Sequence, residues 1–365
     1  ELAPFSVRLC PTTSVCVPDA PPSVSDATVD AVALCEILGI PIVTPSLPAF
    51  NYLSSAHPLY LGNQFGGDRP YPYGSPDLMV QIGSREPNAA TPDTATARYV
   101  AIGLDTNMLG RTRGLDQAVV GDVRATVQDL AAAVKSMVTG DRLTRIRDER
   151  LAVVAPAIAA AKAARLAAAN KVFNQPVIHP DQLGYEMEQA LDANALLVTE
   201  NAPGLQGKHD FLSYGPGADR KQNIGHGGGS LGWGVGAAVG AKLAAPDRQV
   251  VLSIGDGSVM YSAGGFWSMA RHSTPVLTIV WNNHNYQTVR SGAYRYNKRM
   301  VETDRYPGLY LGDPDIDFVK LAESQGVKGQ RVTRAADIPA ALKRGSAETR
   351  AGNPYLIEFV VSRVG

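Results

Sequence analysis

The chain has 365 residues, and Lys plus Arg equal Asp plus Glu at 34 each, so its formal net charge is zero. This balance gives no electrostatic reason to expect a nucleic-acid or membrane-surface partner. The length allows about two domains with separate cores, and no uninterrupted apolar run reaches the roughly 18 residues that a membrane helix needs. Three scattered cysteines and no visible signal peptide favour a cytoplasmic location.

The first part of the chain divides into an unpatterned segment and an alternating one. Residues 1–23 are rich in Pro, Ser and Thr without a clear period, and we predict an irregular lead-in. Residues 24–140 alternate between helical and strand patterns, which predicts a middle α/β domain. Expected helices cover 27–39 and 123–137, and expected strands cover 40–46, 77–83 and 97–105.

The second part begins with a helical connection. Residues 141–176 are rich in Ala, Arg and Lys, which predicts one or two exposed linker helices that end at Pro176. Residues 177–365 then form the second domain. Both domains are expected to be three-layer α/β units with mainly parallel sheets, so the predicted fold class is α/β.

One motif stands out in the second domain. The apolar run Val250 to Ile254 predicts a strand buried on both faces, and Gly255-Asp256-Gly257 follows it. A helix is expected between 262 and 272, and Pro275 begins the next strand, which ends at Asn282-Asn283. Because a β-α-β unit is right-handed and parallel, the two polar strand ends should lie side by side at the ligand-binding edge of the sheet.

The residue types in this motif suit a metal ion. One carboxylate, one amide oxygen and one backbone carbonyl are hard oxygen donors, which Mg²⁺ or Ca²⁺ prefers over zinc. Such a set leaves positions for phosphate oxygens and water. The sequence therefore predicts a divalent cation that holds a diphosphate. A Rossmann-type dinucleotide site around Gly232, Gly234 and Gly236 is a weaker alternative, because polar residues rather than a strand precede these glycines.

Residues 177–363 resemble the diphosphate-binding domain of the thiamine diphosphate (ThDP)-dependent 2-oxo acid enzymes. The phrases that carry the likeness include GGSLGWGVGAAVGAKLAAPDRQVVLSIGDGS, WNNHNYQTVR and GNPYLIEFVV. Within the family, benzoylformate decarboxylase is most similar in pattern, followed by acetolactate synthase. The resemblance implies a ThDP-binding fold with a Rossmann-like middle domain. It also implies a ThDP- and Mg²⁺-dependent lyase or transferase that cleaves or forms a C–C bond next to a carbonyl, in 2-oxo acid decarboxylation or carboligation.

The same resemblance assigns the cofactor residues. Asp256 and Asn283 would bind the metal through side-chain oxygens, and Asn285 through its main-chain carbonyl. His284, between these ligands, is expected to point toward solvent. The residues expected to contact the cofactor are Asn201, Gly229, Ser230, Leu231, Gly255, Asp256, Gly257, Ser258, Asn283, Asn285 and Tyr286.

Three positions have more specific expected roles. Leu231 would support the cofactor from below and force its two rings into a V shape. His226 is a candidate proton donor or substrate ligand, with a side chain that can titrate near neutral pH. Tyr286 and Val289 would line the substrate pocket, although Tyr286 could equally be a packing residue.

Further partners also follow from the resemblance. The pyrimidine-binding domain of the family, with its proton-relaying Glu, is expected on a second chain or a missing N-terminal segment, in a homo- or hetero-oligomer. FAD in the middle domain is possible but disfavoured. Two alternatives stay open, namely a non-catalytic partner subunit and the ThDP-binding subunit of a 2-oxo acid oxidoreductase. The second would need Fe–S clusters, which three scattered cysteines disfavour.

Overall fold

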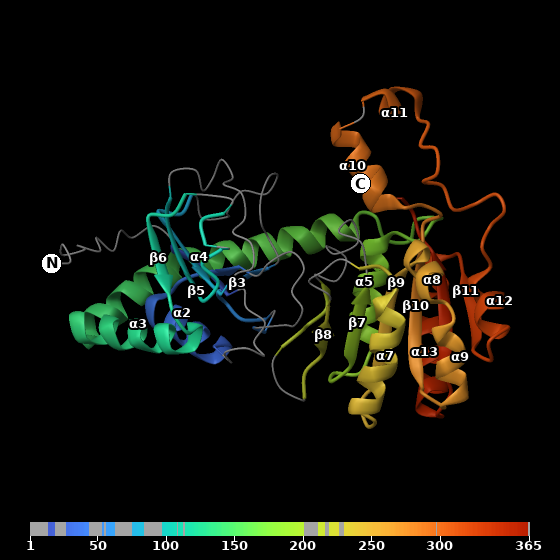
Figure 1. Cartoon of the computed structure of the whole chain (residues 1–365), viewed down its shortest axis with the longest axis horizontal. Coiled ribbons are helices and arrows are strands. Elements are labelled where there is room, and N and C mark those ends of the chain that lie inside the picture. The colour runs from blue at the N-terminus through green and yellow to red at the C-terminus, as the bar shows by residue number, and fades with distance from the viewer. Residues whose placement is uncertain are drawn as a thin grey trace. The chain divides into compact units, whose positions relative to one another are not determined.

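A computed structural model shows two compact units. The residues described are 14–18, 27–43, 53–54, 56–62, 75–83, 97–107, 109–111, 114–200, 211–215, 219–225, 230–296 and 298–363. The first unit comprises 1–48 and 52–165, and the second comprises 49–51 and 166–365. Both contain a six-stranded sheet, and every pairing between the described strands is parallel. The predicted α/β class with parallel sheets is confirmed (Figure 1).

The sheet of the first unit has the order β3-β2-β1-β4-β5-β6. Its strands are β1 (Ser14–Pro18), β2 (Ile42–Val43), β3 (Tyr60–Gly62), β4 (Leu78–Ile82), β5 (Arg98–Gly103) and β6 (Gln117–Val120), and its helices are α2 (Thr28–Leu38), α3 (Val123–Met137) and most of α4 (Gly140–Asn170). Helix α3 covers the same residues that its sequence pattern predicts. Apolar side chains of α2, α3 and α4 share one core cluster with strands β2, β4 and β5.

Strand β1 lies inside the segment that we expected to be an irregular lead-in. It pairs with β2 and β4 near the middle of the sheet. The expectation was therefore wrong for Ser14–Pro18. The residues SVCVP are too few to show a period, and the prolines, serines and threonines around them are typical of a loop. The strands that pair with this segment are distant in sequence, so the local sequence gives no sign of them.

The sheet of the second unit has the order β11-β12-β10-β9-β7-β8. Its strands are β7 (Leu196–Glu200), β8 (Gln222–Ile224), β9 (Val250–Gly255), β10 (Val276–Asn282), β11 (Lys328–Val332) and β12 (Tyr355–Val360). Its helices are α5 (Pro180–Ala190), α7 (Trp233–Ala244), α8 (Asp256–Ser262), α9 (Gly265–Arg271), α10 (Gln287–Tyr296), α11 (Lys298–Thr303), α12 (Phe318–Glu323) and α13 (Ile338–Arg350), with a 3-10 turn at Ala335–Asp337. The helix expected between 262 and 272 corresponds to α9, and a further short helix, α8, begins directly at Asp256.

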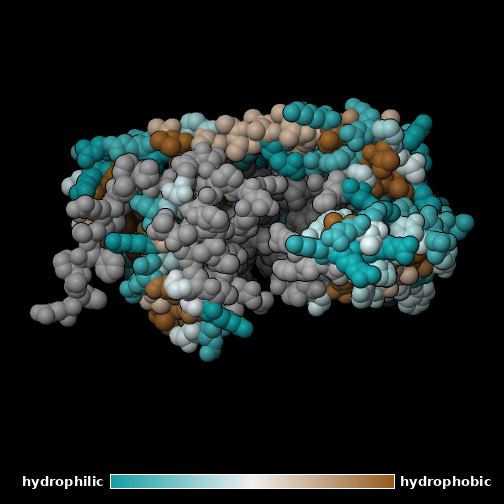
Figure 2. Space-filling model, turned by 90° about the horizontal axis from the view of Figure 1, so that it is seen from above, coloured by the Kyte–Doolittle hydropathy of each residue, from teal (hydrophilic) through white to brown (hydrophobic). Residues whose placement is uncertain are grey.

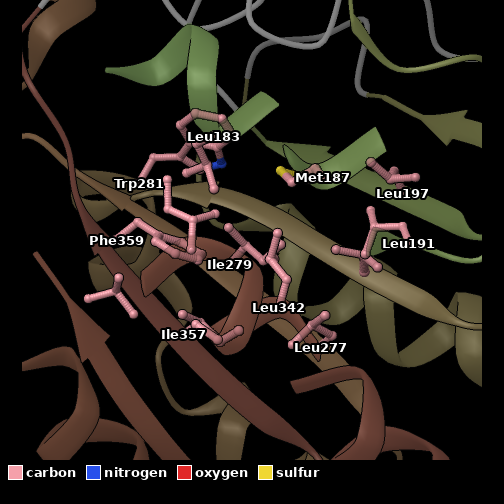
Figure 3. Close-up of a cluster of buried hydrophobic side chains, with 14 of the residues drawn as sticks. Leu183, Met187, Leu191, Leu197, Leu277, Ile279, Trp281, Leu342, Ile357 and Phe359 are labelled. Carbon is pink, nitrogen blue, oxygen red and sulfur yellow. The ribbon is translucent and has the colours of Figure 1, made fainter. Parts of the chain in front are cut away.

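Two hydrophobic clusters show that this unit has three layers. One cluster joins α5 and α13 to the sheet, and it includes Leu183, Leu342 and the fully buried Trp281 (Figure 3). The other joins α7, α8, α9 and α12 to the sheet through different strand residues, such as Leu252 and Ile254. Because both faces of β9 and β10 are covered, these strands are apolar without alternation, as expected for a central parallel strand.

Helix α4 contains a long apolar window that Lys162 and Arg165 interrupt. By length and composition alone, it is the one helix in the described part of the chain that could cross a membrane, and only 11% of its most apolar window is buried. Figure 2 shows its exposed, mildly hydrophobic surface as a pale brown band. Alanine is the most frequent residue of this window, and Val154 and Ile158 of α4 are buried in the core of the first unit. One such helix is weak evidence for a membrane span.

Candidate functional site

Three strand ends meet at the carboxyl edge of the second sheet. In the strand register, Glu200 of β7 lies beside Ile254 of β9, and Trp281 of β10 lies beside Gly255. The residues that follow these positions, Asp256 and Asn283, therefore emerge from neighbouring strands at one edge. The sheet topology brings together what the sequence motif separates by more than twenty residues.

Asp256 is a buried carboxylate with an unsatisfied oxygen. It is 4% exposed and begins helix α8. Its Oδ1 accepts a hydrogen bond of 2.8 Å from the Gly257 N–H, whereas its Oδ2 is buried without a hydrogen-bond partner. Burial raises the pKa of this carboxyl from 3.8 to about 6, and nearby backbone N–H groups, first that of Gly257 and then those of residues 283–285, partly oppose the rise. A carboxylate oxygen in this condition is well suited to bind a cation.

The loop after β10 forms the other side of the site. Asn283 and Asn285 are both buried, and the Asn283 Oδ1 accepts a hydrogen bond of 2.9 Å from the Asn285 N–H. The Asn285 carbonyl accepts a hydrogen bond of 2.8 Å from the Gln287 N–H. Each of these oxygens keeps a second lone pair. Together with the Asp256 Oδ2 they make a set of three hard oxygen donors, which fits Mg²⁺.

A chain of side chains that the sequence motif did not reveal fixes this loop. The Asn282 Oδ1 accepts from the His284 N–H at 3.0 Å, and its Nδ2 donates to the Glu358 Oε1 at 2.7 Å. Glu358 is fully buried in β12, and its Oε2 accepts from the Arg331 Nε at 2.9 Å. The hydrogen bond from the His284 N–H to Asn282 fixes the loop with His284 in a left-handed backbone conformation, at φ of 55°. The sequence does contain one signal of this residue: a single Glu within the apolar run YLIEFVV indicates a charge that is buried and therefore paired.

The His284 side chain does not point to solvent as expected. Its Nδ1 lies 3.1 Å from the Asp315 Oδ1, and the imidazole is 23% exposed. The backbone of the loop is also clamped, because the His284 carbonyl accepts from Leu311 N–H and the Leu309 carbonyl accepts from Tyr286 N–H. Residues 309–311 therefore support the proposed metal loop from outside the strand-turn-strand motif.

The remaining motif residues have distinct surroundings. A Cβ on Gly257 would lie 2.5 Å from Cε1 of Tyr286, so this glycine lets the tyrosine ring pack against the turn. Ser258 is buried, and Gly255 is the residue before helix α8. Val289 is exposed on α10.

The loop before α7 carries the other predicted cofactor contacts. Ser230 is exposed and the Leu231 side chain is 46% exposed, so it is available to a ligand. Asn201, His226 and Gly229 lie outside the described residues.

A buried glutamate at the end of β7, Glu200, contacts the backbone at the start of helix α7. Both carboxylate oxygens of Glu200 accept hydrogen bonds, one from the Gly232 N–H and one from the Gly234 N–H. A dinucleotide site of the Rossmann type would use such N-terminal amides for a pyrophosphate. Since Glu200 already holds two of them, the structure disfavours that alternative. The described residues also contain no cluster of three or more His, Cys, Asp or Glu side chains suited to a metal ion.

Comparisons with known proteins agree with this geometry. Residues 209–359 match the family described as "Thiamine pyrophosphate enzyme, C-terminal TPP binding domain". Most of the second unit is therefore similar to a thiamine pyrophosphate-binding domain. The resemblance inferred from the sequence motifs is therefore confirmed.

Curated relatives are similar to this chain over different shares of its length. A probable acetolactate synthase large subunit of Methanococcus aeolicus is 25% identical over 92% of the chain and 56% of its own length. Benzoylformate decarboxylase of Pseudomonas aeruginosa is 38% identical over 36% of the chain and 23% of its own length.

A solved structure extends the likeness to nearly the whole chain. It is the ThDP-dependent 4-hydroxybenzoylformate decarboxylase of Rhodococcus jostii RHA1, with a TM-score of 0.71 and 27% identity. The match covers 97% of this chain and 62% of that protein. The chain thus spans little more than half of the synthase relative and under two thirds of this decarboxylase.

Proposed function

We propose that this chain is the ThDP- and Mg²⁺-binding part of an enzyme that cleaves or forms a C–C bond next to a carbonyl, either in 2-oxo acid decarboxylation or in acyloin- or acetolactate-type carboligation. The observation that carries the proposal is the buried Asp256 carboxylate, whose Oδ2 lacks a partner beside the Asn283–Asn285 loop. The named activities of the relatives support the reaction class.

Each element of the site has a task in this proposal. Asp256, the Asn283 side chain and the Asn285 carbonyl hold the metal, and Ser258 meets the diphosphate. ThDP supplies, when bound, a nucleophilic carbon and an electron sink for bond cleavage beside a carbonyl. Leu231 supports the rings, and Tyr286 and Val289 border the substrate. The buried surroundings of Asp256 limit the access of water and strengthen the electrostatic interaction with the cation.

In this proposal, hydrogen bonds within the chain set the geometry of the loop that holds the metal. The Glu358–Asn282–His284 chain of hydrogen bonds keeps the loop in place before any ligand arrives. A preorganised loop lowers the entropic cost of assembling three donors around one ion. We infer that ion binding requires little rearrangement of residues 282–285.

A further polypeptide segment belongs to the proposed enzyme. The chain spans 56% of the synthase relative and 62% of the decarboxylase structure. Apolar side chains are exposed beside the site, among them Leu231, Met260 and Tyr261. Exposed apolar groups of this kind are typical of an interface. We propose that a pyrimidine-binding domain, on a partner chain or elsewhere in a longer protein, covers them in a cytoplasmic oligomer.

Calorimetry tests the binding proposal directly. The wild-type chain should bind ThDP in the presence of Mg²⁺ and should lose this binding in EDTA. Asp256→Ala should abolish the binding and leave the circular dichroism spectrum unchanged. Equal ThDP affinity of the variant and the wild type would refute the site.

The reaction class needs a second experiment. A mass spectrum of the intact purified assembly should reveal the additional pyrimidine-binding segment and show whether a flavin is bound. Turnover of pyruvate or benzoylformate by that assembly would support the enzyme. Binding of ThDP without turnover of either substrate would favour the non-catalytic partner subunit.

A further inference from the structure

Glu200 links the end of strand β7 to the loop that carries Leu231. The Glu200 side chain is buried, with a residue exposure of 5%. Its two oxygens accept from the N–H groups of Gly232 and Gly234, which flank the first residue of helix α7. The carboxylate thereby closes over the start of the helix and fixes the backbone directly after Leu231.

The local sequence is adapted to this closure. A Cβ on Gly234 would lie 2.7 Å from the Glu200 Oε2, so only glycine lets the helix approach the carboxylate. Gly232 has a φ of 93° and a Cβ there would lie 2.7 Å from the Tyr261 Cβ. A negative charge at a helix N-terminus is also electrostatically favourable. These features make the Glu200 contact a specific arrangement of the β7–α7 junction.

Leu231 depends on its backbone for its position. Its side chain is 46% exposed and is not part of the hydrophobic clusters of the second unit. Packing therefore does little to orient it, whereas the adjacent residue Gly232 is held by a charge-assisted hydrogen bond. Glu200 thus holds the backbone directly after Leu231.

We propose that Glu200 is a positioning residue that sets Leu231 for the ring portion of ThDP. The inference rests on the proposed function, because it assumes that ThDP is the ligand. It adds a division of labour within the site. Asp256 and the Asn283 loop, at the ends of β9 and β10, hold the metal and the diphosphate, whereas Glu200 at the end of β7 acts on the organic rings alone.

This division predicts a selective defect. Inorganic pyrophosphate with Mg²⁺ uses the metal and diphosphate contacts, and ThDP with Mg²⁺ uses the ring contacts as well. In Glu200→Gln the amide keeps one acceptor oxygen, but its NH₂ group faces a backbone N–H that the second oxygen had accepted. The affinity for ThDP should fall about tenfold, as expected for the loss of one charge-assisted hydrogen bond, while the affinity for pyrophosphate should stay the same.

Isothermal titration calorimetry with both ligands at saturating Mg²⁺ measures the effect. The matched control is Asp122→Asn, which removes a carboxylate that accepts the Ala125 N–H at the start of α3, in the first unit. The control should leave both affinities unchanged. A general loss of protein stability would instead lower the affinities for both ligands together.

The outcomes separate this inference from the proposed function. A wild-type chain that binds neither ligand in Mg²⁺ contradicts the proposed function itself. Tight binding of both ligands with no ThDP preference overturns the role of Glu200, since no ring-dependent affinity then exists. An unchanged preference in Glu200→Gln also overturns it. If that variant does not fold, Gly234→Ala serves instead, because its methyl group displaces the carboxylate and should cause the same selective loss.

Discussion

The buried Asp256 carboxylate, directly after β9, should make the ligand-free protein less stable than the same protein without this charge. Burial raises the pKa of Asp256 from 3.8 to about 6. The folded state then holds the proton more tightly than the unfolded state, so the ionised carboxylate destabilises the fold above that pKa. A rise of about two units corresponds to about 3 kcal/mol.

Asp256→Asn isolates this effect. The substitution removes the charge with little change in shape, although its NH₂ group occupies the position of the partnerless Oδ2 and costs about 1–2 kcal/mol. In EDTA at about pH 7.5, the variant should therefore be more stable than the wild type by about 1–2 kcal/mol. The usual site mutation destabilises a protein, so the expected sign is diagnostic.

Urea unfolding followed by tryptophan fluorescence reports this difference. All three tryptophans of the chain, at positions 233, 267 and 281, lie in the second unit, so the signal follows the unit that contains the site. The advantage of the variant should shrink as the pH falls from about 6 to 4, because the wild-type carboxyl then gains its proton in the folded state. A variant that is less stable than the wild type at about pH 7.5, or an advantage independent of pH, would refute the reasoning.

The same carboxyl predicts the pH dependence of metal binding. Mg²⁺ requires the ionised form, and a proton competes for the same oxygen. The affinity for Mg²⁺ with ThDP should be nearly constant above about pH 7 and fall by about tenfold per pH unit below about pH 6. Calorimetry at several pH values measures it, and a constant affinity down to about pH 4.5 would contradict the assignment of Asp256 as a ligand.

Two further substitutions test the support of the site. Gly257→Ala places a methyl group against the Tyr286 ring, which should lower the unfolding free energy by about 1–3 kcal/mol and weaken ThDP binding. The control is Gly236→Ala, where no neighbouring atom lies within 4 Å of the added Cβ. In the same urea assay, this control should be neutral or stabilising by up to about 1 kcal/mol. Glu358→Ala leaves Asn282 without its acceptor and should cost about 2–4 kcal/mol and reduce ThDP affinity; full ThDP affinity in a folded Glu358→Ala protein would show that the loop does not depend on this side chain.

Local sequence was sufficient for the features that repeat along the chain. The mainly apolar runs at 250–254 and 276–281 predicted buried parallel strands, and the helical pattern of 123–137 predicted α3. Gly255-Asp256-Gly257 and Asn282-Asn283 predicted polar groups at two strand ends, because turns and strand ends leave a direct signal in residue type.

Other features depend on partners that are distant in sequence. Strand β1 is five residues long, and its pairing with β4 joins segments more than sixty residues apart. The roles of Glu200 and Glu358 depend on which backbone amides and side chains the fold places against them. A single residue cannot reveal such a role, since the energy of a buried charge is set by its surroundings.

The sequence by itself determined the α/β class, the apolar strands and the oxygen-rich residues expected to hold a cation. Only the tertiary structure decided which of those oxygens is buried without a partner, which loop is held by hydrogen bonds before ligand binding, and which glutamate closes the start of α7. The physical reason is that residue types fix local conformation and the kinds of available donor, whereas burial and hydrogen-bond geometry arise from contacts between strands and helices that are far apart along the chain.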